Sequence, residues 1–262
     1  MSRFLLAAAT LWRREMVRFY RQPSRVIGAL GSPFVFWLLI GAGLGNSFQP
    51  AGSSARMSYL EYFFPGTLLL ILLFTAIFST ISLIEDRREG FLQSVLVAPV
   101  PRAGFVFGKI LGGTTLALSQ GILFLLIAPF IGIRMGAAGW MQTAAILFLN
   151  GFALTGLGFL IAWRLHSIQG FHAIMNLFLI PLWLLSGALF PPDGAPGWIR
   201  LIMRLNPLSY GLASLHRCLF GQAGSEHLPS LKISVVVMLA AGIILFGLAA
   251  HAAGRRSAED LS

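Results

Sequence analysis

The chain has 262 residues, of which 56% are hydrophobic and only 11% are charged, and its mean hydropathy is +0.80. A soluble globular protein of this length needs more polar side chains to cover its surface, so the composition excludes that class and predicts a membrane protein. The formal net charge of +10 would also suit a nucleic-acid-binding protein. In a membrane chain, however, basic residues report topology, and we expect no nucleic acid as a partner.

The apolar residues form six blocks, each near the roughly 20 residues that a helix needs to cross the hydrocarbon core. We therefore predict an all-α, polytopic membrane protein with six transmembrane helices. The predicted spans are Val26–Gly45, Tyr62–Ile84, Gly104–Ile133, Trp140–Trp163, Gly170–Phe190 and Leu231–Ala253. Pro129 can end the third span early, and Pro181 predicts a kink in the fifth. The small-residue pair Gly108 and Gly112 permits another helix to approach closely.

Residues 1–25 are predicted to form a cytoplasmic amphipathic interface helix in front of a membrane domain, residues 26–262. Four arginines recur on one face of this helix: Arg14, Arg18, Arg21 and Arg25. These cations suit anionic headgroups, while Trp12 and Phe19 on another face suit the acyl boundary, so membrane lipids are expected partners. A passive membrane anchor and a docking surface for a cytoplasmic partner both fit this pattern.

The basic residues are distributed unevenly between the two sides of the predicted membrane domain. Most Lys and Arg residues lie before the first span, between the second and third spans, and after the last span. By the positive-inside rule, these segments face the cytoplasm. Both termini are therefore predicted to be cytoplasmic, which an even number of spans also requires.

A charge cluster opens the segment 85–102, and a short apolar helix follows it. The cluster and helix contain Glu85, Asp86, Arg87, Arg88, Glu89, Gly90, Phe91, Leu92, Val95 and Leu96. Leu92, Val95 and Leu96 fall at i, i+3 and i+4 and form one apolar face. Pro99 and Pro101 end the helix, which is too short to cross a membrane. It either lies on the membrane surface or presents its apolar face to a groove on another protein.

The segment 191–230, between the fifth and sixth spans, is too polar and too rich in proline to cross the membrane. An amphipathic stretch precedes Asn206-Pro207, and a second short helix is expected from Leu208 to Phe220. We expect a helical hairpin at the external interface, with the aromatic side chains at the boundary. The residues assigned to an external gate or cap are Trp198, Asn206, Pro207 and Tyr210, and the sequence leaves both roles open.

Several kinds of site are missing from the sequence. The stretch from Gly104 to Ile110 has the wrong spacing for a nucleotide-binding loop and lacks its hydroxyl, so no ATP is expected on that motif. The five histidines are scattered, and we predict no metal site and no catalytic residue. Ion-coupled carriers need carboxylates near the bilayer centre, and the predicted spans have none there. Gln120, Asn150 and Asn176 are candidates for a substrate path, although interhelical hydrogen bonding explains them equally well.

Two stretches of the sequence resemble the membrane subunit of type-2 ATP-binding-cassette (ABC) exporters, a family of bacterial drug-resistance, lipo-oligosaccharide and polysaccharide export permeases. Glu85 to Val100 is similar to the family's coupling segment, and Gly197 to Tyr210 is similar to its late external motif. The similarity extends over nearly the whole chain. Phe91 departs from the family pattern, since many members carry a small hydroxyl residue there.

The resemblance implies a transport subunit and no enzyme of its own. It implies a homodimer in the bacterial plasma (inner) membrane that binds two copies of a cytoplasmic ABC ATPase. ATP and Mg would be held by the ATPase, and no cofactor by this chain. Leu92, Val95 and Leu96 would dock into an ATPase groove, with ion pairs from the flanking charges.

The expected cargo is hydrophobic or lipid-linked, such as a drug, a lipid or a glycolipid or polysaccharide. Uniformly apolar spans suit such a cargo better than a free sugar, which would need polar and aromatic side chains along its path. Two other functions remain open at this stage: an ion-coupled secondary carrier, and a membrane scaffold that recruits a cytoplasmic ATPase.

Overall fold

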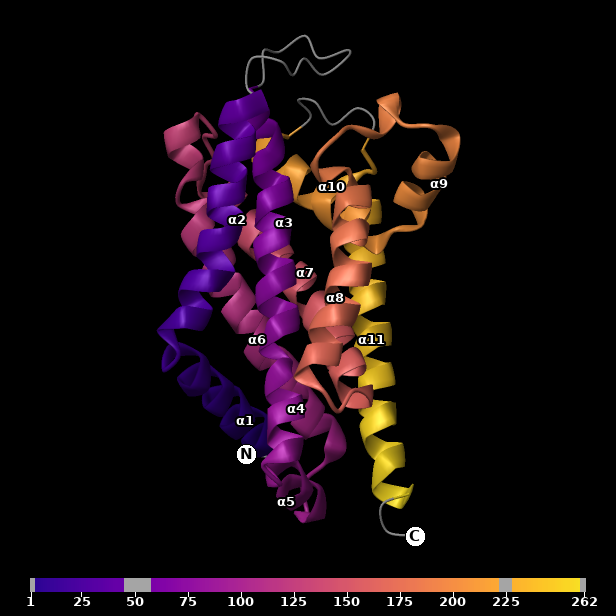
Figure 1. Cartoon of the computed structure of the whole chain (residues 1–262). Coiled ribbons are helices and arrows are strands. Elements are labelled where there is room, and N and C mark those ends of the chain that lie inside the picture. The colour runs from indigo at the N-terminus through magenta and orange to yellow at the C-terminus, as the bar shows by residue number, and fades with distance from the viewer. Residues whose placement is uncertain (1–2, 45–57, 222–227, 260–262) are drawn as a thin grey trace.

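The computed structural model describes residues 3–44, 58–221 and 228–259, and all regular elements among them are helices. In chain order they are α1 (Arg3–Tyr20), α2 (Pro23–Leu44), α3 (Tyr59–Ser79), α4 (Ile81–Arg88), α5 (Phe91–Val97), α6 (Arg102–Leu125), η1 (Ala128–Ile131), α7 (Ala137–Arg164), α8 (Ile168–Trp183), η2 (Leu184–Ala188), η3 (Pro192–Gly194), α9 (Gly197–Leu205), α10 (Pro207–Phe220) and α11 (Leu231–Glu259). The long helices run side by side as one bundle, while α1, α4 and α5 lie at one end and α9 at the other (Figure 1). The last turns of α11 lie at the same end of the bundle as α1 (Figure 1).

The polytopic, all-helical fold that the sequence predicts is confirmed. Among the described residues, five helical stretches are long and apolar enough to cross a membrane: Tyr59–Arg88, Arg102–Ile131, Ala137–Arg164, Ile168–Ala188 and Leu231–Arg255. The apolar stretch of α2, Ile27–Gly43, is shorter than these five. The sixth span therefore stays a prediction.

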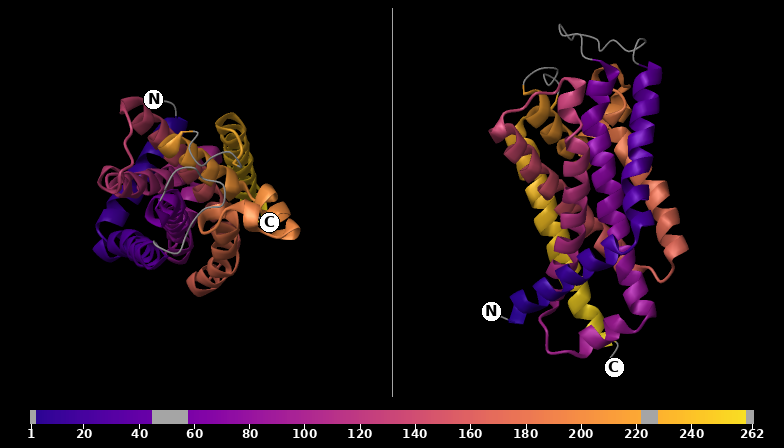
Figure 2. Two further views of the ribbon diagram at one scale, coloured as in Figure 1. Left: turned by 90° about the horizontal axis from the view of Figure 1, so that it is seen from above. Right: turned by 90° about the vertical axis from the view of Figure 1, so that its left-hand side faces the viewer.

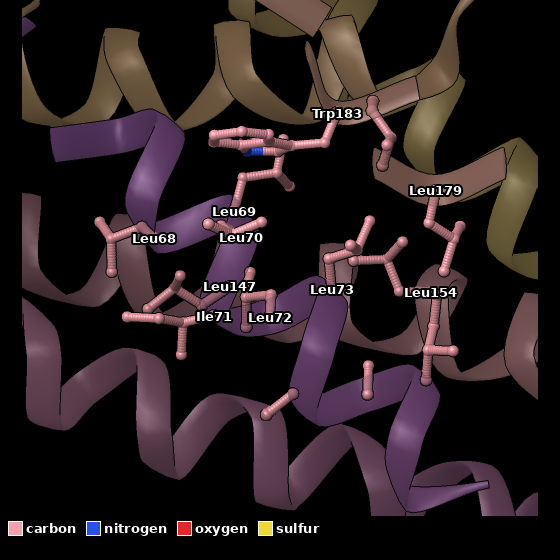
Figure 3. Packing of buried hydrophobic residues seen from close by; sticks show 14 of the residues in the cluster. Leu68, Leu69, Leu70, Ile71, Leu72, Leu73, Leu147, Leu154, Leu179 and Trp183 are labelled. Carbon is pink, nitrogen blue, oxygen red and sulfur yellow. The ribbon is translucent and has the colours of Figure 1, made fainter. Parts of the chain in front are cut away.

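Helix α3 is the centre of the bundle. In the most apolar 18 residues of the stretch Tyr59–Arg88, which begins with α3, 83% are buried inside the protein. The corresponding share is 22% in Ile168–Ala188, which includes α8, and in Leu231–Arg255 of α11. Consecutive residues from Leu68 to Leu73 point in different directions and pack against Leu147 and Leu154 of α7 and against Leu179 of α8 (Figure 3). Because α3 is apolar on all sides, other helices can pack against each of its faces. Figure 2 shows the other long helices arranged around this one.

Pro129 acts as the sequence predicts, whereas the break near Pro181 lies at a glycine further along the chain. Helix α6 ends at Leu125, and Pro129 lies in the 3-10 turn η1 that follows. Pro181 lies near the end of α8, which continues into the π-helical turn η2. Gly187 in this turn has a φ of 96°, a conformation that favours glycine. The Tyr62 hydroxyl donates to the Gly187 carbonyl at 3.0 Å and so satisfies one backbone group at the break.

Candidate functional site

Helix α1 lies obliquely across one end of the bundle, packed against α6 (Figure 2). Three glycines spaced four residues apart on α6, Gly104, Gly108 and Gly112, form the contact surface. A Cβ atom at Gly108 would lie 2.7 Å from the carbonyl oxygen of Ala8, and one at Gly112 would lie 2.9 Å from Cβ of Glu15. Only glycine permits so close an approach. The small-residue pair noted in the sequence thus receives α1.

The orientation of α1 differs from the expected one. Its side chains Arg14 and Arg18 turn into the protein, and Trp12 donates a hydrogen bond from Nε1 to Oγ1 of Thr115 at 3.0 Å. Phe19 is buried. Of the four predicted arginines, Arg14 and Arg18 share the inward face, whereas Arg21 follows α1 and is exposed. The sequence pattern cannot say whether such a face meets lipid or protein.

Asp86 of α4 is the point to which the inward-facing cations converge. It is fully buried, and its two carboxylate oxygens accept hydrogen bonds from Arg14 at 2.7 and 2.9 Å and from Arg18 at 2.9 Å. The ammonium of Lys109 on α6 bonds to the same carboxylate. One carboxylate on α4 therefore holds cations from both α1 and α6.

Two further carboxylates complete this group. The Lys109 ammonium lies 2.6 Å from Oε1 of Glu15 and 3.2 Å from the Ser82 hydroxyl, and Arg18 lies 2.8 Å from Glu85. We call the six residues Arg14, Glu15, Arg18, Glu85, Asp86 and Lys109 the charged junction. Its three cations and three carboxylates balance, which is the condition for burying charges without a large penalty.

Arg14 also connects the charged junction to α5. Burial alone would lower the pKa of the Arg14 guanidinium, but the hydrogen bonds to Asp86 and the charges of Asp86 and Glu15 outweigh burial and raise that pKa. Arg14 therefore stays a cation at any physiological pH. Its guanidinium carbon lies 3.9 Å from the centre of the Phe91 ring, a cation–π contact. Phe91, the residue that departs from the family pattern, thus packs on the junction.

The next two residues of the cluster bind the end of α7. The Arg87 guanidinium donates to the carbonyl oxygens of Trp163 and Leu165, both at 2.7 Å, and Arg88 donates to that of His166 at 3.1 Å. Carbonyl groups at a helix C-terminus lack partners within the helix, and cations satisfy them well. Helix α4 is thereby fixed to α7 as well as to α1 and α6.

The apolar face of α5 packs against this chain and is not free for a partner. Leu92 is only 3% exposed, and Val95 and Leu96 pack against the same core, so the apolar face at i, i+3 and i+4 lies against this chain. The outward residues include Gln93 and Val97, the latter 84% exposed. Gly90, with a φ of 76°, makes the turn from α4 into α5. The burial of Leu92 is the largest difference between the expected and observed coupling segment.

The profile of the ABC-2 type transporter family matches residues 7–220, which include every element of this site. The chain belongs to that family. A protein named as a transport permease, ycf38, from Cyanophora paradoxa is 30% identical over 212 residues, 79% of this chain and 72% of its own length. Nodulation protein J from Rhizobium leguminosarum bv. trifolii is 25% identical over 87% of both chains. The inner membrane transport permease YadH of Escherichia coli is 22% identical over 98% of this chain and all of its own.

Membership in this family makes the chain the membrane subunit of an ABC exporter. Permeases of the family work with an ABC ATPase and are not themselves ATPases. The resemblance stated from the sequence is thus confirmed, and so is the export function. The ion-coupled carrier and the scaffold are no longer needed to explain the sequence.

A cavity of about 390 Å³ lies beside the charged junction of the permease. Its walls come from α1, α2, α3, α4 and α8 and are mostly apolar, with Phe19, Phe74 and Phe78 among them. Glu85 belongs both to the cavity wall and to the charged junction. The hydroxyl of Thr75, another wall residue, is buried and has no hydrogen-bond partner in the described part of the chain.

The three candidates for a substrate path do not line this cavity. Gln120 and Asn150 are buried inside the bundle, whereas Asn176 is exposed on α8. The Asn150 amide donates to the carbonyl of Ile146 one turn earlier, at 3.0 Å. No contact recorded for the described residues brings the three side chains together.

At the other end of the permease, Asn206 holds the corner between α9 and α10. Its Oδ1 accepts from the backbone N–H of Leu208 at 3.0 Å, and its Nδ2 donates to the carbonyl of Leu182 at 2.6 Å. Pro207 is the first residue of α10. The Tyr210 hydroxyl donates to the carbonyl of Arg204 at 2.9 Å. The predicted helices of this hairpin are confirmed, and whether they gate or cap stays a prediction.

Sequence reasoning missed two members of the charged junction, Glu15 and Lys109. One signal was present: Lys109 lies two turns inside the apolar helix α6, where a cation needs a carboxylate partner. The sequence does not say which carboxylate that is. Of the predicted interface arginines, Arg21 is exposed, and the side chain of Arg25 lies outside the described residues.

Proposed function

We propose that this permease exports a hydrophobic or lipid-linked compound and that energy from the ATPase enters it through α5 and the charged junction. In this proposal two copies of the chain form a dimer in the bacterial plasma membrane, with both termini on the cytoplasmic side. Each copy binds one ATPase, which holds ATP and Mg. The observation that carries the proposal is the attachment of α4, next to the exposed helix α5, to three other helices.

The outward face of α5, around Gln93 and Val97, is the surface that we assign to the ATPase. Leu92 instead anchors α5 to its own chain, as its burial requires. A push on α5 would then move α4, because only Glu89 and Gly90 separate the two helices. Asp86 would pass the movement to α1 and α6, since leaving a buried charge without its partner costs about 3–5 kcal/mol.

The cavity beside the junction is the place that we assign to the cargo. Its volume of about 390 Å³ falls within the range of small-molecule sites, and its walls are mainly apolar. One relative is named a daunorubicin resistance permease, DrrB1 of Streptomyces coeruleorubidus, 22% identical over 89% of this chain. A mainly apolar compound of small-molecule size suits the cavity. Glu85, shared by cavity and junction, would let cargo binding and ATPase movement influence each other.

The assignment of α5 is tested with Val97→Asp. Because Val97 is 84% exposed, the change places a charge on the docking surface without disturbing the core. We expect the variant to insert and fold normally but to lose co-purification with the ATPase. Val97→Thr, which keeps the shape of the side chain, is the matched control and should co-purify as the wild type does. Normal co-purification of Val97→Asp would refute the docking surface.

The cargo cavity is tested with Gly28→Trp. Gly28 lines the cavity, and a Cβ atom added there would meet no atom within 4 Å, so the position accepts a side chain and an indole there would occupy part of the cavity. We expect daunorubicin to raise the ATPase rate of the reconstituted wild-type complex and not that of Gly28→Trp. Gly43→Trp, on the same helix and also in open space, should respond like the wild type. Equal stimulation of all three complexes would place the cargo elsewhere.

A further inference from the structure

Helix α9 lies at the end of the bundle opposite α1 and α5 (Figure 1) and carries an exposed apolar face. Trp198, Leu201 and Leu205 on this face are 66%, 58% and 75% exposed, whereas Met203 on the opposite face is buried. An amphipathic helix with an outward apolar face and a tryptophan is typical of a segment that lies in a membrane interface. The outer side of α9 therefore suits contact with the acyl region of the membrane.

Two cations lie on the flank of the same helix. Arg200 and Arg204, one turn apart, both line a cavity of about 510 Å³ that is bordered by η2, by the start of α10 and by the start of α11. The polar residues that share this lining are Ser186, Ser209 and Tyr210. No carboxylate of the described residues lines it. The described lining of this cavity, which we call the recess, is therefore basic and lies directly beside an apolar surface.

The hydrogen-bonding capacity of this recess is largely unused within the described residues. Arg200 gives one hydrogen bond, to the carbonyl of Ala195 at 3.2 Å, out of the five that a guanidinium can donate. The Arg204 guanidinium makes no ion pair or hydrogen bond to any described residue. The Ser209 hydroxyl is buried and lacks a partner in the same part of the chain. Two guanidinium forks and a hydroxyl are the donors that proteins use for phosphate.

The geometry points to a binding site for an anionic phospholipid, with its phosphate diester between Arg200 and Arg204 and its acyl chains along Trp198 and Leu201. A free phosphate would use the cations alone, while an apolar compound would use only the outer face. A phospholipid contacts both the cations and the apolar face, because its headgroup is linked to its acyl chains just as the recess adjoins the apolar face of α9. The outer leaflet is its source, and this part of the inference rests on the proposed topology.

The site also has a defined wall. The Arg217 guanidinium donates to the carbonyls of Leu228 and Pro229, both at 2.7 Å, and these two residues line the recess opposite α9. The Tyr210 hydroxyl bonds to the Arg204 carbonyl and fixes α9 to α10. A bound lipid would therefore bridge α9 to the segment that leads into α11 and stabilise this end of the bundle.

Lipid binding to the full-length permease in neutral detergent tests the site. Phosphatidylglycerol and phosphatidylcholine are added separately, and native mass spectrometry counts retained lipid while thermal unfolding reports stabilisation. We expect the wild type to retain phosphatidylglycerol at least tenfold more than phosphatidylcholine. The double variant Arg200→Gln/Arg204→Gln should lose this preference. Arg134→Gln, an exposed arginine between η1 and α7, is the control and should keep it.

Three results would overturn the inference. The first is a double variant that retains phosphatidylglycerol as the wild type does. The second is equal protection by inorganic phosphate alone, which would assign the recess to free phosphate. The third is a Ser209→Ala variant that prefers phosphatidylglycerol over phosphatidylcholine as strongly as the wild type does. We expect a severalfold weaker preference in this variant, which also tests the site if the double variant does not fold. Co-purification with the ATPase should be normal in all of these variants, so the result does not depend on the α5 docking surface.

Discussion

The two ends of the bundle use arginine in opposite ways. At the α1 end, Arg14 and Arg18 are bound to the buried carboxylate of Asp86. At the α9 end, Arg200 and Arg204 line an open recess without a described carboxylate. The first arrangement fixes helices to one another, while the second leaves donors available to a ligand. The difference teaches that a count of basic residues on each side of a membrane protein predicts topology and says little about what each cation does.

The comparison extends to the way each end is held together. The α1 end is joined by ion pairs between side chains of three helices. The α9 end is joined by hydrogen bonds from side chains to carbonyl groups that the kink in α8 and the corner before α10 leave free, such as that of Leu182. Ion pairs suit a place that transmits force between rigid helices. Carbonyl contacts suit an irregular backbone that needs each polar group satisfied.

Replacement of Asp86 tests the ion-paired end with the largest effect. Asp86→Asn leaves three cations without the charge that they share, and removal of one partner from a buried ion pair costs about 3–5 kcal/mol. Thermal unfolding in detergent should show this loss, together with detachment of α1. Glu89→Gln is the control, because the Glu89 side chain is 60% exposed and lies 3.6 Å from Arg18. An Asp86→Asn variant that unfolds at the wild-type temperature would show that the charged junction does not stabilise the α1 end.

The same substitution at both ends sharpens the contrast. Arg14→Gln removes two charge-assisted hydrogen bonds to a buried carboxylate and should cost about 1.5–3 kcal/mol. Arg204→Gln, measured without anionic lipid, should change stability by no more than about 0.5 kcal/mol, as at other surface sites. Chemical denaturation of both variants in one detergent measures the difference. Equal losses would mean that the two ends do not differ in the way described.

Close packing of α1 on α6 is tested by Gly108→Ala. The added Cβ would lie 2.7 Å from the Ala8 carbonyl oxygen and 2.9 Å from its Cα, so α1 must shift, at a cost of about 1–3 kcal/mol. Gly247→Ala on α11, where no atom lies within 4 Å, should leave the unfolding midpoint unchanged. If both variants unfold together with the wild type, the close approach of α1 to α6 is not required.

A moderate loss of stability is expected for Asn206→Ala at the other end. The variant loses the N-cap of α10 and the donor to the Leu182 carbonyl, which should cost roughly 1–2 kcal/mol. Proteolysis of the α9–α10 corner should accelerate while co-purification with the ATPase stays normal. Loss of ATPase binding in this variant would show that the two ends are not separate in the way proposed.

Much of the fold can be predicted from the sequence because it depends on local chemistry. Apolar blocks predict spanning helices, and Pro129 predicts the early end of α6, whereas the break in η2 lies at Gly187 and not at Pro181. The charged junction is harder to predict from the sequence, because the partner of each side chain lies on a helix far away along the chain. Arg14 meets a residue 72 positions later, and Lys109 meets Glu15, 94 positions earlier.

The coupling segment shows the same limit on a short scale. The spacing of Leu92, Val95 and Leu96 predicts an apolar face correctly, but burial of that face against its own chain or against a partner gives the same sequence pattern. Asp86 and Arg87 likewise look like a solvated charge cluster. Only the arrangement of α1, α6 and α7 around α4 shows that they are engaged inside the molecule.

The central claim is that movement of the ATPase reaches the bundle through the charged junction, and Arg18→Gln tests it most directly. This variant leaves Arg14 and Lys109 on Asp86 and should fold and bind the ATPase. An environment-sensitive fluorophore at position 141, where Met141 is 75% exposed at the far end of α7, reports ATP-driven change in the reconstituted complex. We predict a fluorescence change with ATP in the wild type and in Arg21→Gln, and none in Arg18→Gln. The same change in Arg18→Gln as in Arg21→Gln would contradict the account.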